Sequence, residues 1–320
     1  MDIIAVDDPT DAQIRDWHAI MAAGQVHDQV EGSAQTLTET SARLLDGARH
    51  LLWEAVQDGD VIGVGYARLP HEPGRAGEID VHVRPDRRRL GAGSRLLAVA
   101  AEQLRAGGAR TVLAQVMAGT PAVPFLESHH FRCVLTLQEL MLSVRELDPA
   151  RLRALAESGP AAYRVIRWRG NAPEVFAQEF AAAKVATAEP PAGEQMNWDV
   201  ERVREMAEMV AKRGDDLYTV AALHDDGSIA GFTEMVVPGA QPWRAIQHDT
   251  TVVPEHRGRR IGIWLKATML EWLRAERPEV AEVETDNADD NRHMLAVNEE
   301  LGFRRFRESR EYLADLSDLP

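Results

Sequence analysis

Residues 252 to 262 read Val252-Val253-Pro254-Glu255-His256-Arg257-Gly258-Arg259-Arg260-Ile261-Gly262, and the apolar run Ile263-Trp264-Leu265 follows at once. This order predicts the end of a strand, a basic turn that contains glycine, and the first turn of a helix. Such a turn directs successive backbone N–H groups and the positive end of a helix at one spot. A phosphate or a pyrophosphate is the kind of ligand that fits that spot.

The chain contains an earlier copy of this segment, which reads Val83-Arg84-Pro85-Asp86-Arg87-Arg88-Arg89-Leu90-Gly91-Ala92-Gly93-Ser94. The copies lie 169 residues apart, counted from Pro85 to Pro254 or from Gly93 to Gly262. A predicted hairpin precedes each copy, with its turn at Asp58-Gly59 in the first half and at Asp226-Gly227 in the second. Internal repetition of this kind predicts two similar domains, residues 1–150 and residues 151–320.

The same order of elements is predicted in both halves: β, α, α, β, β, β, α, β, α, β. We therefore expect an α+β fold, in which each half forms a mixed, mostly antiparallel sheet flanked by helices.

The composition excludes several classes of protein. A net charge of −15 at pH 7 argues against a general nucleic-acid binder, so no nucleic acid partner is expected. No apolar run approaches the ~18 residues that a membrane helix needs, so no membrane partner is expected. Residues 1–8 lack the basic region and the long apolar run of a signal peptide, and we expect a cytoplasmic protein. The oligomeric state cannot be read from the sequence.

No metal site is expected either. Cys133 is the only cysteine, which leaves no disulfide framework and no cysteine-based zinc site. The acidic run at residues 286–291 has Asn291 where the calcium loop of an EF-hand needs glycine.

The repeated order with its Arg-x-x-Gly-x-Gly turn resembles the GNAT superfamily of acyl-CoA-dependent N-acyltransferases over nearly the whole chain. Residues 88–93 match the turn pattern completely, whereas Arg260 stands where the second copy would have its first glycine. A second signature of the family, an asparagine followed by a helix and Leu-Gly-Phe, is present at Asn291 and Leu301-Gly302-Phe303. The resemblance implies acetyl-CoA as cofactor and the primary amine of a small molecule as acceptor.

By this resemblance, the two turns hold the CoA pyrophosphate, and the preceding strand and the late helix line its pantetheine arm. Each arginine has solvated surface charge as its alternative role, and Asn291 is also a plausible helix cap. The residues so implicated are Val83, Arg88, Arg89, Leu90, Gly91, Gly93 and Ser94 in the first half, and Val252, Val253, Arg257, Gly258, Arg259, Arg260, Ile261, Gly262, Asn291 and Asn298 in the second.

Acetyl transfer to an amine needs a base that takes the proton of the ammonium. Glu234 is the first candidate, because it shares a strand face with Phe232 and Val236, and poor solvation would raise its proton affinity. A structural ion pair is the alternative role for Glu234. Asp249 is the second candidate. Their expected first-half counterparts are Arg68, which cannot act as a base, and Asp80.

Many members of the family use a tyrosine on the late helix as the acid. The matching positions are Asn298 in the second half and Leu126 in the first, so neither half has this phenol. We expect residues 151–320 to be catalytic and residues 1–150 to be degenerate or non-catalytic, binding CoA or shaping the substrate cleft. A non-catalytic acyl-CoA sensor is the alternative function.

Overall fold

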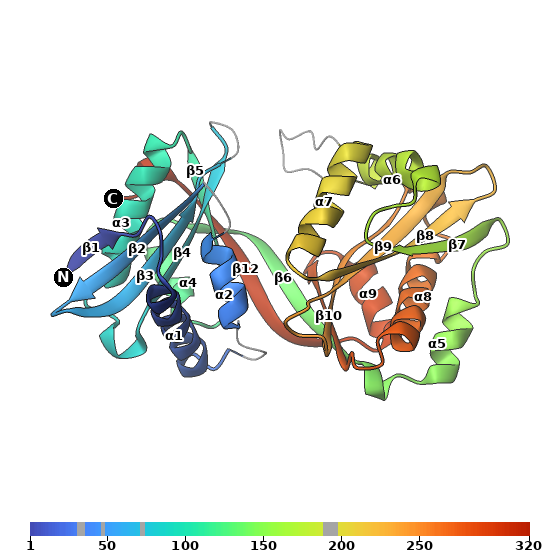
Figure 1. Ribbon diagram of the computed structural model, residues 1–320, viewed down its shortest axis with the longest axis horizontal. Helices are drawn as coiled ribbons and strands as arrows, with labels where there is room; N and C mark the ends of the chain where they lie inside the picture. Colours follow the sequence, from blue (N-terminus) through green and yellow to red (C-terminus); the bar gives the residue numbers. More distant parts are fainter. Residues whose placement is uncertain (31–35, 46–48, 71–73, 188–197) are drawn as a thin grey trace. The chain divides into compact units, whose positions relative to one another are not determined.

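The computed structural model describes residues 1–30, 36–45, 49–70, 74–187 and 198–320 (Figure 1). Contacts divide the chain into two compact units, Met1–Gln138 with Arg307–Pro320, and Glu139–Phe306. Both units consist of a mixed sheet with flanking helices, which confirms the predicted α+β class. No described helix is both long and apolar enough to cross a membrane.

In the first unit, helices pack on both faces of a sheet with the strand order β1-β2-β3-β4-β5-β12. One face of β3 places Val64 and Tyr66 in a core with α1 and α2. On the other face Gly63 and Gly65 leave room for Leu96 of α3, since an added β-carbon would lie within 3.4 Å of that side chain. The elements are β1 Asp2–Ala5, α1 Asp11–His27, α2 Leu37–Leu45, β2 His50–Gln57, β3 Asp60–Arg68, β4 Ala76–Val83, α3 Ala92–Ala106, β5 Thr111–Met117, α4 Ala122–Ser128 and β12 Arg304–Asp315.

The second unit repeats this plan with the strand order β6-β11-β10-β9-β8-β7. Its largest core lies under α8, which is buried nearly all round, as expected of a central helix. A smaller core on the other face contains Phe180 of α6, Val203 of α7 and Phe232 of β9. The elements are β6 Arg132–Ser143, α5 Pro149–Ala156, β7 Tyr163–Arg169, α6 Glu174–Thr187, α7 Val200–Lys212, β8 Asp216–His224, β9 Ile229–Val237, β10 Arg244–Val252, α8 Ile261–Glu276, β11 Glu282–Ala288 and α9 Arg292–Leu301.

The units differ from the predicted halves in their last strands. The chain passes from one unit to the other within β6, between Gln138 and Glu139, and again within β12, between Phe306 and Arg307 (Figure 1). Residues 309–315 of β12 pair with β5 and belong to the first unit, whereas residues 139–150 belong to the second. The repeat in the sequence specifies that each sheet ends in a similar strand. It does not specify which copy of that strand each sheet edge takes.

A lysine lies in the core of the second unit. Lys266 of α8 is 1% exposed, and its Nζ lies 5.2 Å from the centre of the Phe303 ring. Burial lowers the pKa of Lys266 to about 7, from an ordinary value of 10.5.

The exchange of strands predicts that the C-terminal segment stabilises the first unit. Leu316 is 1% exposed in the core formed with α3 and β5, so Leu316→Ala should cost about 2–5 kcal/mol. Hydrogen exchange of the amides in Thr111–Met117 measures this loss. The control is Val134→Ala, at a position that is 45% exposed, where a change within about 0.5 kcal/mol is expected. Equal effects of the two substitutions would contradict this assignment of the segment.

The buried lysine predicts a pH-dependent stability. Between pH 7 and 10.5, the unfolded chain holds a proton on Lys266 that the folded chain has lost. The free energy of unfolding should therefore rise with pH, by up to roughly 1.4 kcal/mol per pH unit from this residue. Urea unfolding from pH 7 to 10 should show a smaller slope for Lys266→Met, whereas Lys212→Met, at an exposed position, should keep the wild-type slope. An unchanged slope in Lys266→Met would refute the depressed pKa.

Candidate active site

The two predicted turns follow the same backbone path. Each has two residues with positive φ, Arg89 (65°) and Gly91 (88°) in the first turn, and Gly258 (77°) and Arg260 (60°) in the second. At 169 residues of separation, arginine and glycine are therefore exchanged between the two left-handed positions. Arg260 departs from the sequence pattern and still keeps the conformation that glycine adopts in the other copy.

The second turn keeps open space at the start of α8. The side chain of Arg260 is 61% exposed, and its Nη2 lies 2.7 Å from Glu300 Oε1. An added β-carbon at Gly262 would meet only Val252 Cγ2, at 3.9 Å. The first N–H groups of a helix have no partner within the helix. The turn therefore offers backbone donors next to an exposed cation.

Several predicted phosphate contacts are engaged within the turns themselves. Arg88 donates two hydrogen bonds to Asp28, at 2.6 and 2.9 Å, and its Nε donates to the Val83 carbonyl at 3.2 Å. Arg257 Nε donates to the Val252 carbonyl at 3.0 Å, and Arg259 Nη1 donates to the backbone carbonyl of residue 255 at 2.6 Å. These arginines hold the turns against the preceding strands.

Strands β10 and β11 separate beside the second turn. Their parallel pairing is confined to residues 244–246 and 282–284. Beyond it lies a cavity of about 590 Å³, which we call the strand cavity, lined by Arg244, Ile246, Gln247, His248, Asp249 and Thr250 of β10 and by Glu284, Thr285, Asp286, Asn287 and Ala288 of β11.

A register shift between Gln247 and Thr250 interrupts the pairing of β10 with β9 at this point. Irregularities of this kind change the direction of side chains next to active sites. Asp249 lies within the irregularity and lines the strand cavity, with a side chain that is 63% exposed.

Glu234 forms a buried ion pair, which was the alternative to its role as a free base. Lys184 Nζ of α6 lies 2.6 Å from Glu234 Oε2 and 3.4 Å from Asp249 Oδ2. Lys184 is 7% exposed and Glu234 8%. Both predicted carboxylates thus share one ammonium, and the sequence analysis missed this lysine.

Aromatic rings surround the same ammonium. Lys184 Nζ lies 5.3 Å from the ring centre of Phe180, 4.8 Å from that of Trp198 and 4.8 Å from that of Phe232. We call these three residues the aromatic cage. A cation is attracted to the faces of such rings, and the attraction is larger where water is excluded.

In the first unit the corresponding positions are occupied differently. Gly63 pairs with Val83 as Gly231 pairs with Val252, so the counterpart of Glu234 is Tyr66. The prediction of Arg68 was wrong by two residues, because pairing in the sheet fixes the alignment.

The aspartate of the first unit is also held in ion pairs. Asp80 lies 2.9 Å from Arg43 Nη1 and 2.8 Å from His82 Nε2. Burial raises the pKa of Asp80, but the His82 ring and the Arg43 guanidinium outweigh it and hold the pKa well below its usual range. Asp80 is therefore a poor proton acceptor.

The two asparagines of the late helix have different roles. Asn291 caps α9, because its Oδ1 accepts a hydrogen bond from the backbone N–H of Met294 at 3.1 Å. Asn298 is fully buried, and its Nδ2 donates to Oδ1 of Asn287, a residue of the strand cavity, at 2.6 Å. Among the described residues, Asn298 Oδ1 and Gln247 Oε1 are buried without a hydrogen-bond partner. Such acceptors are suited to a ligand that brings N–H donors.

Asp286 of the strand cavity was also missed by the sequence analysis. Partial burial raises its pKa, the Glu139 carboxylate raises it further, and His248 opposes the change. The carboxyl group therefore keeps its proton to a higher pH than a free aspartate does.

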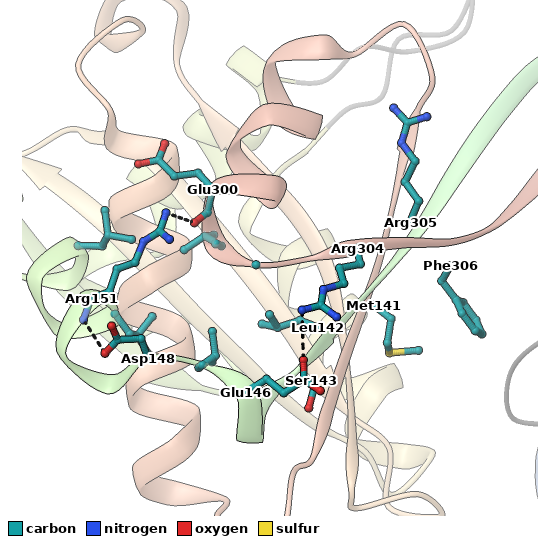
Figure 2. A pocket seen from close by; sticks show the side chains of 15 residues that line it. Met141, Leu142, Ser143, Glu146, Asp148, Arg151, Glu300, Arg304, Arg305 and Phe306 are labelled. Atoms are coloured by element: carbon teal, nitrogen blue, oxygen red, sulfur yellow. Dashed lines mark hydrogen bonds and ion pairs between the residues drawn. The ribbon is translucent and has the colours of Figure 1, made fainter.

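A second cavity of about 380 Å³ lies between α5, the end of α9 and strand β6 (Figure 2). Arg151 donates to the Glu300 carbonyl there at 2.8 Å, and Arg304 lies 3.5 Å from Glu146. None of the predicted site residues lines it. The strand cavity is therefore the candidate active site.

The Acetyltransferase (GNAT) family model matches residues 14–131 and 182–303. No curated protein sequence matches this chain significantly. Among solved structures, a tandem GNAT protein from the clavulanic acid biosynthesis pathway matches with 26% identity and a TM-score of 0.81, over 98% of this chain and 98% of its own.

Two further structures share the fold at lower identity. A GCN5-related N-acetyltransferase from Sphaerobacter thermophilus matches 99% of this chain and 96% of its own, with 20% identity and a TM-score of 0.74. A glucosamine N-acetyltransferase region of a fungal multi-domain protein matches 98% of this chain and 38% of that chain, with 14% identity and a TM-score of 0.73. The family matches fall one in each half, and the chain belongs to the GNAT family of acetyltransferases, with two copies of the domain in tandem.

Proposed function

We propose that this chain transfers the acetyl group of acetyl-CoA to the primary amine of a small molecule by direct attack, and that the second unit carries the reaction. The observation that carries this proposal is the separation of β10 from β11. Strand β10 lines the resulting cavity with residues 244–250 and then leads into the turn before α8. One strand thus connects a place for an acyl group with a place for a pyrophosphate.

The residues present fit this cofactor. The pantetheine arm of CoA carries amide N–H groups, and Asn298 Oδ1 and Gln247 Oε1 are buried acceptors without partners among the described residues. The open start of α8 suits an anion. Bound there, acetyl-CoA would supply an activated thioester. Residues Val252, Val253, Ile261 and Gly262 would bind through the backbone, with Arg260 contributing positive charge.

Asp249 is the group best placed to take a proton from an incoming ammonium. It reaches the strand cavity, whereas Glu234 lies buried behind it against Lys184. No phenol stands at Asn298, and a thiol is acidic enough to leave as the thiolate without a dedicated acid.

The first unit favours a different role. Its turn repeats the backbone path of the second, but Tyr66 replaces Glu234 and Asp80 is held by Arg43 and His82. We propose that this unit binds CoA without turnover.

The turn predicts where affinity is most sensitive. Gly262→Ala should be tolerated by the free protein, because the added carbon would have its nearest contact at 3.9 Å. The same carbon would occupy the space of an anion at the α8 start, so acetyl-CoA affinity should fall about 10-fold, or 1.4 kcal/mol. Calorimetry measures the affinity, and an unchanged melting temperature is the control. Wild-type affinity in Gly262→Ala would remove the turn from the binding site.

The reaction predicts a contrast between the two aspartates. Asp249→Asn should lower kcat/KM about 100-fold or more on the best acceptor of an amine panel, because general-base catalysis is lost. Asp80→Asn, its counterpart in the first unit, should leave kcat/KM within about twofold. Thiol release measures both rates, and melting curves monitor folding. Equal losses in the two variants would contradict the assignment of catalysis to the second unit.

A further inference from the structure

Lysine is rare in this chain and stands at unusual places. Only Lys184, Lys212 and Lys266 occur among 36 lysines and arginines. Lys212 is exposed on α7, whereas Lys184 and Lys266 are buried. Arginine serves for almost every other positive charge. Lysine differs from arginine in that it can lose its proton and act as a nucleophile.

Lys184 lies next to the candidate active site. Its Nζ is 3.4 Å from Oδ2 of Asp249, a side chain that lines the strand cavity. The ion pair with Glu234, at 2.6 Å, provides an adjacent proton acceptor. In the first unit the cation beside the equivalent aspartate is Arg43, a guanidinium that stays protonated. A reactive amine is therefore present only in the unit to which we assign catalysis.

We propose that Lys184 is an acyl acceptor, and that the second unit acetylates its own Lys184 when acetyl-CoA is bound. This inference rests on the proposed function. It adds a covalent modification site to an enzyme whose other acceptors are free amines.

The step balances with acetyl-CoA as the only co-reactant. The ammonium of Lys184 gives one proton to Glu234, which passes it to solvent. The neutral Nζ then attacks the carbonyl carbon of the thioester, so that a C–N bond forms and the C–S bond breaks. The nitrogen gives a second proton to the departing thiolate, which leaves as the CoA thiol. One proton remains on the amide.

The surroundings of Lys184 suit the product as well as the reactant. The aromatic cage offers ring faces on which a neutral amide can pack. Acetylation also removes the positive charge that lies between Glu234 and Asp249, so both carboxylates become available to a cation from solution.

The test incubates the full-length chain with isotopically labelled acetyl-CoA and follows the label by intact mass and peptide mapping. We expect one acetyl group per chain, on Lys184, with a rate constant independent of protein concentration because the transfer is intramolecular. The other lysines are internal controls. Exposed Lys212 reports uncatalysed acetylation by the thioester, and Lys266, with a pKa of about 7, reports acetylation that follows from a low pKa alone.

Acetylation of Lys184 should exceed that of Lys212 at least 10-fold in the folded chain, and this ratio should fall to about one in urea. Glu234→Gln, which removes the proton acceptor, should slow labelling of Lys184 at least 10-fold and leave labelling of Lys212 unchanged. Equal labelling of Lys184 and Lys212, or a rate that rises with protein concentration, would overturn the inference.

Two further results separate this inference from the proposed function. Acetyl-CoA binding and turnover of a free amine, with Lys184 unlabelled, would overturn the self-acetylation alone. Absence of acetyl-CoA binding in calorimetry would overturn both.

Discussion

Strands β10 and β11 are hydrogen-bonded at three residues each and then separate, and this local loss of pairing determines the arrangement of the second unit. A sheet that parts in its interior leaves backbone groups without a neighbouring strand, which requires a different partner for them. Helix α8 is buried nearly all round and keeps the two strands on a common core despite the gap. The turn before α8 is thereby fixed at the end of β10, and the strand cavity and the anion-binding position belong to one rigid framework.

The two units use one backbone plan and differ in their ionic groups. In both, a cation from a helix lies beside the aspartate of the strand that precedes the turn, Arg43 in the first unit and Lys184 in the second. The difference between a guanidinium and an ammonium matters chemically, because only the ammonium gives a nucleophile when it loses a proton. Replacement of Glu234 by Tyr66 removes the second carboxylate from the first unit. Shared geometry thus allows both units to bind the same cofactor, while the side chains restrict the chemistry to one of them.

Local features of the site could be predicted from the sequence, and non-local features could not. The turns at Gly91 and Arg260 follow from short-range patterns, and the repeat predicted two α+β domains. The exchange of β6 and β12 depends on which sheet edge captures a strand, and similar strands carry no signal for that choice. The ion pair of Lys184 with Glu234 joins residues 50 positions apart, and only the scarcity of lysine in the chain pointed to it. The counterpart of Glu234 required the observed strand register.

The central claim is that the separated strands and the turn before α8 bind acetyl-CoA. Hydrogen–deuterium exchange of the full-length chain, with and without saturating acetyl-CoA, tests it directly, since backbone amides that bind the cofactor become protected. The account predicts slower exchange at residues 250–253 of β10 and its turn and at residues 261–264 of α8. Unchanged exchange in both segments at millimolar acetyl-CoA would contradict it.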